Sequence, residues 1–210
     1  MRPLAPTRVH LVRHGTTLLN RTHRYRGRID VPLDQGGWQD AWTAADALRD
    51  EGLAAIYASP LRRARDTARI IADAAGLDAV FDLPGLLNVD YGLWEGLTAD
   101  EAAERFPAEY EAYQTYATGA ACPGGESLEV AAERVLLSLR MLALLHPAGT
   151  VAAVSHAVNV RLALAAVTDR PRHLWRRDLP NGSVTAFEVT GDRIELVAAP
   201  ASAEGLAAHA

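Results

Sequence analysis

The chain has 210 residues, a formal charge of -5 and 49% hydrophobic residues, values typical of one globular domain and not of a disordered protein. The net negative charge argues against a general nucleic-acid binder, because such a protein needs a basic surface. All 21 basic residues are arginine, which excludes lysine-based chemistry such as a Schiff base or a phosphate-loop lysine. Cys122 is the only cysteine, so an internal disulfide and a multi-cysteine metal site are excluded as well.

No stretch of the sequence reaches the roughly 20 apolar residues that a membrane span requires. Residues 1–12 also lack the apolar core of a signal peptide. We therefore expect a cytoplasmic protein that has neither a membrane nor a nucleic-acid partner.

Strand-like and helix-like apolar patterns alternate along the chain. The pattern predicts strands over residues 7–13, 53–58, 79–81, 150–154, 183–189 and 193–198. It predicts helices over residues 35–51, 60–75, 98–116 with a break at Pro107, 127–145 and 157–168. This alternation is typical of an α/β fold, here a three-layer α/β/α sandwich with a mostly parallel central sheet. We expect a single domain over residues 1–210, with residues 98–125 as an insertion that caps the site. Trp38 and Trp42 are expected to be core or groove-filling aromatics.

The first predicted strand leads directly into Arg13, His14 and Gly15. A histidine can attack phosphorus, and a fixed guanidinium can stabilise the charged oxygens of the transition state, so this pair suits phosphoryl transfer. The tripeptide is weak evidence by itself, since a histidine beside an arginine at a strand end is common. However, His156 follows the most apolar strand, and ligands of parallel sheets bind at the carboxyl ends of the strands. We therefore expect both histidines in one site.

Five segments resemble, in order, the motifs of the histidine phosphatase superfamily, the phosphoglycerate mutase-like enzymes. They are Arg13–Asn20 (RHGTTLLN), Ser59–Ala68 (SPLRRARDTA), Tyr91–Gly96 (YGLWEG), Gly124–Ser127 (GGES) and Val154–His156 (VSH). The second segment places the matching guanidinium at Arg63 and leaves Arg62 at a variable, solvated position. The resemblance covers most of the chain and is strongest to the small, broad-specificity phosphatase branch.

The resemblance implies that neutral His14 attacks phosphorus through one ring nitrogen, while the Gly15 carbonyl holds the other. Arg13, Arg63 and His156 would then bind the phosphoryl oxygens. The two arginines would also disfavour the imidazolium form of His14. No metal and no cofactor are expected, because the arginines supply the positive charge that Mg²⁺ supplies in kinases.

The loop after the first motif carries further candidate substrate-binding residues. Asn20 would add a neutral donor beside Gly15. Arg26 stands before Gly27 at a position where the family usually has glutamine, so a preference for a substrate with a second negative charge is a hypothesis. A solvated loop is the alternative for Arg26.

One departure from the family pattern concerns the general acid. Many relatives have glutamate in the spacing Leu-x-Glu-x-x-x-Gly, and here Asn88 occupies that position. Because an amide does not donate and recover a proton, two explanations stay open. One is that Asp90, two residues on and on the same face if the segment is extended, is the general acid. The other is that the leaving group is good enough to depart with only hydrogen-bonding help, with Asn88 as a substrate-binding residue. We favour Asp90, since Glu95, the other nearby carboxylate, looks structural.

These residues predict a metal-independent phosphomonoester hydrolase of the histidine acid type, which forms a phosphohistidine with a small phosphorylated metabolite. A cofactor-dependent phosphoglycerate mutase is the first alternative, opposed by the missing glutamate and the short chain. A catalytically decayed phosphate-binding protein is the second, opposed by the retained histidines and arginines. The substrate and the oligomeric state, a homodimer included, are left open.

Overall fold

A six-stranded mixed sheet forms the centre of the computed structural model, which describes residues 5–117, 119–168, 175 and 178–200. Its strands are β1 (Thr7–Arg13), β2 (Ala55–Ala58), β3 (Val80–Asp82), β4 (Thr150–Ser155), β5 (Val184–Thr190) and β6 (Arg193–Ala198). The order is β3-β2-β4-β1-β5-β6, in which the first four strands are parallel and β5 and β6 are antiparallel to their neighbours. The six predicted strands are confirmed, with their ends moved by one or two residues.

The helices begin where the sequence offers caps. They are α1 (Leu18–Arg21), α2 (Gln35–Leu48), α3 (Arg62–Ala74), α4 (Ala99–Arg105), α5 (Pro107–Gln114), α6 (Leu128–Leu145) and α7 (Ala157–Val167), with 3₁₀ turns at Pro84–Leu86 and Gly92–Trp94. Asp34 accepts a hydrogen bond from the Gly37 amide at the start of α2, and Ser127 accepts one from Val130 at the start of α6. Pro107 separates α4 from α5 as expected.

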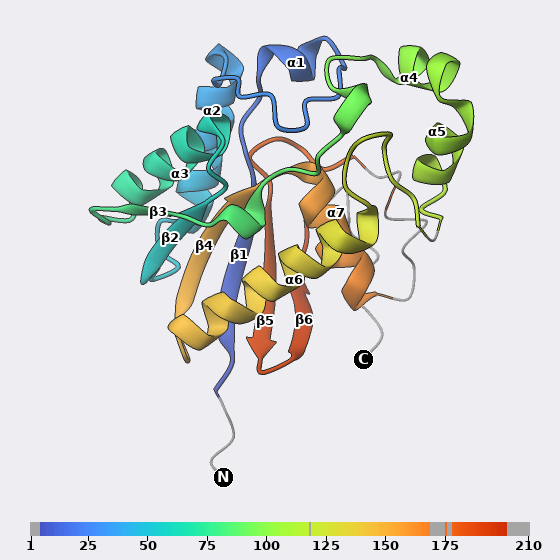
Figure 1. Ribbon diagram of the computed structural model, residues 1–210. Coiled ribbons are helices and arrows are strands. Elements are labelled where there is room, and N and C mark those ends of the chain that lie inside the picture. The colour runs from blue at the N-terminus through green and yellow to red at the C-terminus, as the bar shows by residue number, and fades with distance from the viewer. Residues whose placement is uncertain (1–4, 118, 169–174, 176–177, 201–210) are drawn as a thin grey trace.

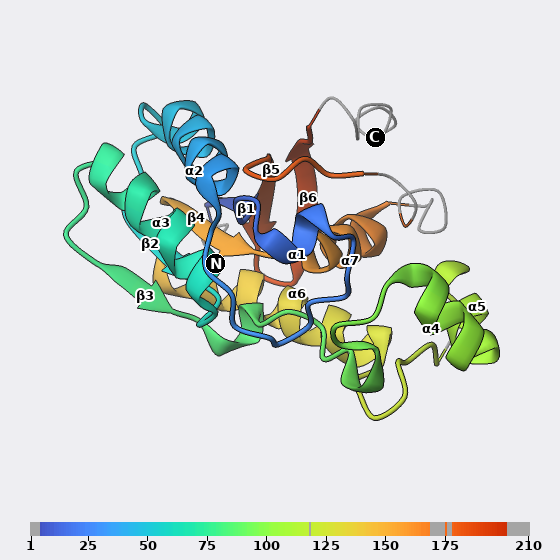
Figure 2. The same ribbon diagram turned by 90° about the horizontal axis from the view of Figure 1, so that it is seen from above.

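Alternate side chains of the strands point to opposite faces of the sheet. Val12, Ile56 and Val154 pack with α2 and α3, whereas Val9 and Val151 pack with α6 and α7. Figures 1 and 2 show the sheet between these two pairs of helices. The predicted three-layer α/β/α arrangement is therefore confirmed.

A third cluster of buried side chains lies beyond the carboxyl ends of the parallel strands. It joins residues of α4, α5 and the 3₁₀ turn before them to the first turns of α6 and to α7, with Trp94, Tyr113, Leu128 and Leu162 among its members. Figures 1 and 2 show α1 above the ends of the parallel strands, and α4 and α5 together to one side of it. The segment 98–125 thus lies at the end of the sheet where both histidines emerge.

The expectation that Trp38 and Trp42 belong to the core is wrong, because their side chains are 45% and 50% exposed. The small residues Ala41, Ala44 and Ala45 face the sheet instead and are fully buried. Alanines on the inner face let α2 lie close to its neighbours, so the two indoles are left on the outer face. Among the helices of the described ranges, none has the length and apolar character that a bilayer crossing requires.

The buried Trp94 and the partly exposed Trp38 give a matched test of stability. Trp94 is fully buried, so Trp94→Ala is expected to lower the free energy of unfolding by about 3–5 kcal/mol. Trp38→Ala, on the exposed face of α2, should cost about 1 kcal/mol or less. Urea denaturation of both variants measures the difference, and equal losses would contradict the burial pattern.

Candidate active site

The two predicted histidines lie next to each other at the carboxyl ends of neighbouring parallel strands. His14 directly follows β1 and His156 directly follows β4, and the amide of His14 donates to the carbonyl of Ser155 at 3.0 Å. The ring centroids are 5.1 Å apart with an interplanar angle of 63°. Both rings are buried. The expectation that the sheet brings them into one site is confirmed.

A backbone carbonyl determines the tautomer of His14. Nδ1 lies 2.6 Å from the carbonyl oxygen of Gly15, which only accepts hydrogen bonds. Nδ1 therefore carries the proton, and Nε2 keeps its lone pair. The amide of Gly15 donates to Thr67 Oγ1 at 3.1 Å, so both backbone groups of this predicted substrate-binding residue contact the protein itself.

Glycine at position 15 is required by close backbone packing. A Cβ atom there would lie 2.2 Å from the carbonyl oxygen of Gly37 in the first turn of α2. Gly37 in turn lies against Thr16, where its own Cβ would be 2.0 Å from the carbonyl oxygen. The His14 loop is thus held between β1 and α2 at a distance that only glycines permit.

Three arginines surround His14. Arg63, from the first turn of α3, donates to the carbonyl of Ile29 at 2.8 Å and to that of Gly27 at 2.9 Å, while its buried Nε has no partner in the described chain. The Arg13 guanidinium donates to a backbone carbonyl, that of Leu179. Arg26, from the loop before Gly27, has a buried Nε without a partner as well.

The charge of this cluster is poorly compensated. Burial, with the charge of Arg26 as the next cause, lowers the pKa of Arg63 to about 9 and that of Arg13 to about 10. Among the described residues, the one ion pair of these guanidiniums is a 3.6 Å contact between Arg13 and Asp178, whose side chain is 87% exposed. The cluster therefore favours a bound anion.

The same surroundings keep both histidines neutral. Burial lowers the pKa of His14 well below 6.5, and the charges of Arg63, Arg26 and Arg13 lower it further. Burial also lowers the pKa of His156 well below 6.5, followed by the effect of Arg63. The direction agrees with the predicted effect of Arg13 and Arg63 on His14, and Arg26 contributes as well.

Ser59 orients the second ring. Nε2 of His156 lies 2.9 Å from Ser59 Oγ, and that oxygen already accepts a hydrogen bond from the Leu61 amide at 3.4 Å. The Ser59 hydroxyl is then free to donate to Nε2, which leaves the proton of the neutral ring on Nδ1. Nδ1 is buried and has no partner within the described residues, so it is available as a donor to a ligand.

A cavity of about 560 Å³ opens beside this cluster. Its lining residues are Arg13, Asn20, His23, Arg24, Tyr25, Arg26, Tyr91, Ala99, Tyr113, Gln114, Ala157, Arg161, Trp175, Asp178, Pro180 and Asn181. Arg13 and Arg26 both line it and act on the pKa of His14, so they connect the cavity to the buried histidines. Arg26 is partly buried and lines this cavity, and its role in binding a second negative charge stays a prediction. Asn20 also lines the cavity, and its Oδ1 accepts from the amide of Thr17 at 3.0 Å.

Asn88 lies in the buried part of the site. Its Nδ2 donates at 3.1 Å to the Gly27 carbonyl, the same oxygen that accepts from Arg63. Its Oδ1 is buried without a partner in the described chain, and the acceptor at Gly27 determines this orientation of the amide.

Asp90 is not among the residues that line the cavity. Its Oδ1 accepts from the Gly92 amide at 3.0 Å, and its Oδ2 lies 3.1 Å from the guanidinium of Arg28. The bond to Gly92 bends the side chain back along its own backbone. The structure thus brings Asn88, but not Asp90, beside the arginines, and a role of Asp90 as general acid stays a prediction.

Sequence reasoning missed several residues that shape the site. Arg161 lines the cavity from α7, and Tyr91 and Tyr113, whose hydroxyls are 2.9 Å apart, form part of its wall. The position of Arg161 in α7, close after His156 in the sequence, could have indicated that it lies in the site. No pattern in the sequence pointed to Tyr113, because the packing of α5 brings it to the cavity.

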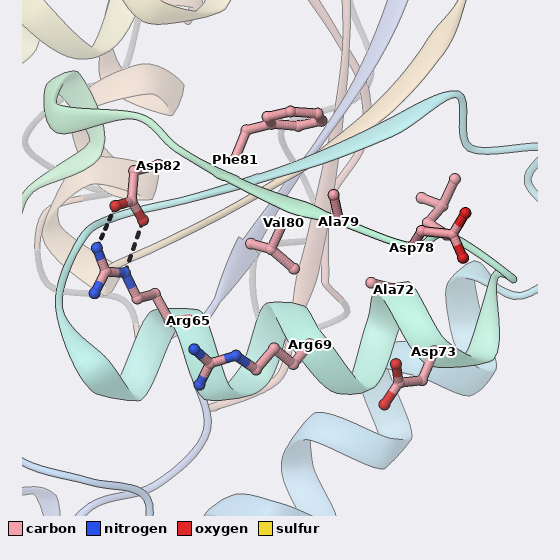
Figure 3. Close-up of a pocket in the computed structure, with 10 residues that line it drawn as sticks. Arg65, Arg69, Ala72, Asp73, Asp78, Ala79, Val80, Phe81 and Asp82 are labelled. Carbon is pink, nitrogen blue, oxygen red and sulfur yellow. Dashed lines mark hydrogen bonds and ion pairs between the residues drawn. The ribbon is translucent and has the colours of Figure 1, made fainter.

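A second hollow of about 440 Å³ lies between α3 and β3 (Figure 3). Arg65 and Asp82 form an ion pair at its edge, and Phe81 lies on the strand side. None of its lining residues belongs to the histidine and arginine cluster. In the described ranges, there is no group of three or more His, Cys, Asp or Glu side chains that could hold a metal ion.

Comparison with known proteins identifies the family. The family model of the histidine phosphatase superfamily (branch 1) matches residues 9–200. The chain therefore belongs to the histidine phosphatase superfamily, as the motifs indicated.

Two relatives and one solved structure illustrate the range of similarity. The chain is 38% identical to the bifunctional protein Rv2228c of Mycobacterium tuberculosis over 89% of its own length, but it spans only 52% of that relative. It is 34% identical to a metal-independent phosphoserine phosphatase of Arabidopsis thaliana, covering 77% of this chain and 69% of the relative. The structure of Bacillus stearothermophilus YhfR superposes with a TM-score of 0.83 at 31% identity, covering 91% of this chain and 95% of YhfR.

The neutral histidines predict a pH dependence of stability. In the unfolded chain these rings titrate near their ordinary pKa of 6.5, so below pH 6.5 the unfolded state binds more protons than the folded state. The free energy of unfolding should therefore fall as the pH drops below 6.5, by up to about 1.4 kcal/mol per pH unit for each ring, until the pH reaches the folded pKa. Urea denaturation at pH 7.5, 6.0 and 5.0 measures the slope. His14→Gln should make the slope shallower, and an unchanged slope would show that His14 is not buried in the neutral form.

Proposed function

We propose that the protein is a phosphatase, a phosphomonoester hydrolase that forms a phosphohistidine at His14. One observation carries the proposal: Nδ1 of His14 donates to the Gly15 carbonyl, so an unprotonated Nε2 is held within a cluster of guanidiniums. A neutral imidazole is the nucleophilic form, and a poorly compensated positive cluster is what a phosphoryl dianion needs.

The chemistry balances with the side chains that are present. Nε2 of His14 attacks phosphorus, the bond from phosphorus to the leaving oxygen breaks, and the phosphoryl group remains on the ring. Arg13, Arg63 and Nδ1–H of His156 donate to the equatorial oxygens in both steps. Water then attacks phosphorus, the P–N bond breaks, and both protons of the water leave on inorganic phosphate.

Three further features belong to the proposal. The charge of the arginines makes a metal unnecessary, in agreement with the metal-independent phosphoserine phosphatase to which the chain is similar. The substrate is a small phosphorylated metabolite, because the cavity of about 560 Å³ accommodates a molecule of that size. Residues 98–125 act as a cap of a single domain, since Ala99, Tyr113 and Gln114 line that cavity.

A direct assay tests the proposal. With p-nitrophenyl phosphate and an excess of chelator, the wild type is expected to release phosphate, and His14→Ala should lower kcat/KM by about 10³-fold or more, because no other group forms the covalent bond. Quenching a reaction with ³²P-labelled substrate should leave an acid-labile label on His14.

Incubation with 3-phosphoglycerate separates the alternatives. Isomerised product in place of free phosphate would identify a mutase, and neither reaction on any substrate would identify a binding protein. Activity that disappears with the chelator and returns with a divalent metal would contradict the metal-independent mechanism.

A further inference from the structure

The position at which many relatives have a glutamate holds an amide in this chain. Asn88 occupies the buried position beside the arginines, with its Nδ2 on the Gly27 carbonyl and its Oδ1 without a partner in the described chain. An amide oxygen accepts a hydrogen bond but does not deliver a proton to a departing alkoxide. A site that acts on alkyl phosphates normally gains about 10²–10⁴-fold from such a proton.

The nearby carboxylates are engaged elsewhere. Both oxygens of Asp90 are used by Gly92 and Arg28. Glu95 accepts from the Arg28 amide at 2.6 Å, and Glu126 pairs with Arg134 at 2.6 Å. None of these three carboxylates lines the cavity.

Asp178 is the one carboxylate among the lining residues. Its side chain is 87% exposed, at the outer part of the site, and its contact is with Arg13. It is therefore a candidate acid that a direct substitution must test.

Arg26 adds positive charge where the acid is missing. Arg26 lines the cavity together with Arg13, and its Nε is buried without a partner among the described residues. Its charge lowers the pKa of Arg13, Arg63 and His14, in agreement with a place close to them. In the part of the chain that the structure describes, no ion pair joins it to a carboxylate.

A guanidinium and a carboxylic acid favour different leaving groups. A guanidinium stabilises negative charge that stays on the departing oxygen, but it does not supply a proton because it remains charged at neutral pH. An alkoxide needs the proton. A phosphate released from an anhydride does not, since it is stable as an anion and its oxygens match the guanidinium fork.

Resting on the proposed phosphohistidine chemistry, we propose that the preferred substrate is a phosphoric anhydride and not an alkyl ester, with Arg26 binding the departing phosphate. Nε2 of His14 attacks the terminal phosphorus, and the bridging P–O bond breaks. The remaining phosphate leaves as an anion on Arg26 with no proton transferred. Water then releases inorganic phosphate from His14 as described above.

The cavity has room for the rest of such a molecule. Arg161 lines it next to Arg26 and Arg13, so positive charge continues outward from the histidines. The rings of Tyr25, Tyr91 and Trp175 form an aromatic part of the cavity wall. Aromatic rings of this kind stack on planar groups, which makes nucleoside diphosphates suitable probes.

A matched pair of substrates tests the proposal. ADP and AMP carry the same nucleoside, but the terminal phosphoryl group of ADP is in an anhydride and that of AMP is in an alkyl ester. We expect kcat/KM for ADP to exceed that for AMP by about 100-fold or more, the scale of an absent general acid. A ratio near one, or a preference for AMP, would overturn the proposal.

A series of substituted phenyl phosphates gives a second readout that does not depend on nucleoside binding. Without a general acid, log kcat/KM should fall steeply as the pKa of the leaving phenol rises. A flat dependence would overturn the proposal. If none of these phosphates is hydrolysed and His14 is not labelled, the proposed function itself fails; hydrolysis with a flat dependence removes only the anhydride inference.

Variants separate the roles of the residues. Arg26→Gln should lower kcat/KM for ADP by about tenfold or more, and that for AMP much less. Asn88→Glu should raise turnover of AMP relative to ADP and make the activity on the alkyl ester fall at higher pH, where the introduced carboxylic acid loses its proton. Asp90→Asn and Asp178→Asn test the two remaining carboxylates. If either substitution removes alkyl-ester turnover and flattens the pH profile, that residue is a general acid and the proposal is wrong.

Discussion

The site depends on positive charge that is buried beside a histidine that stays neutral. Burying guanidiniums is costly unless their N–H groups find acceptors, and here backbone carbonyls serve as those acceptors. Arg63 donates to Gly27 and Ile29, and Arg13 donates to Leu179. Carbonyls satisfy the hydrogen bonds but leave the net charge in place. The charge therefore acts on whatever enters, and it keeps His14 unprotonated.

The fold supplies the rigidity that this arrangement needs. The parallel pairing of β1 and β4 sets the two histidines side by side, and Gly15 allows α2 to pack against the loop that follows β1. Loop 26–29 is fastened from the other side by Arg63 and Asn88, which share the Gly27 carbonyl. Displacement of that loop would therefore disturb Arg26 and Arg63 together.

Asn88 and Arg26 are two departures from the family pattern that meet in one place. In the linear sequence they are separate substitutions, 62 positions apart. In the structure both are connected to the Gly27 segment, one through a hydrogen bond and the other through the chain. An amide in place of the family's glutamate and a guanidinium in place of its glutamine would favour a leaving oxygen that departs with its charge, and the anhydride proposal rests on this pairing.

The sequence by itself determined the elements and the histidine pair. Periodicity of two in the strands, caps at Asp34 and Ser127, and the rule that ligands bind at strand ends are local properties that composition and spacing carry. Tertiary structure alone decided which polar groups face the cavity. Asp90 shares a short segment with Asn88, yet a hydrogen bond to Gly92 turns its carboxylate toward Arg28. Trp38 has the right spacing for the core, yet alanines on the same helix occupy the inner face. In both cases the outcome depends on partners far away in the sequence or on the closeness of packing, which no local pattern records.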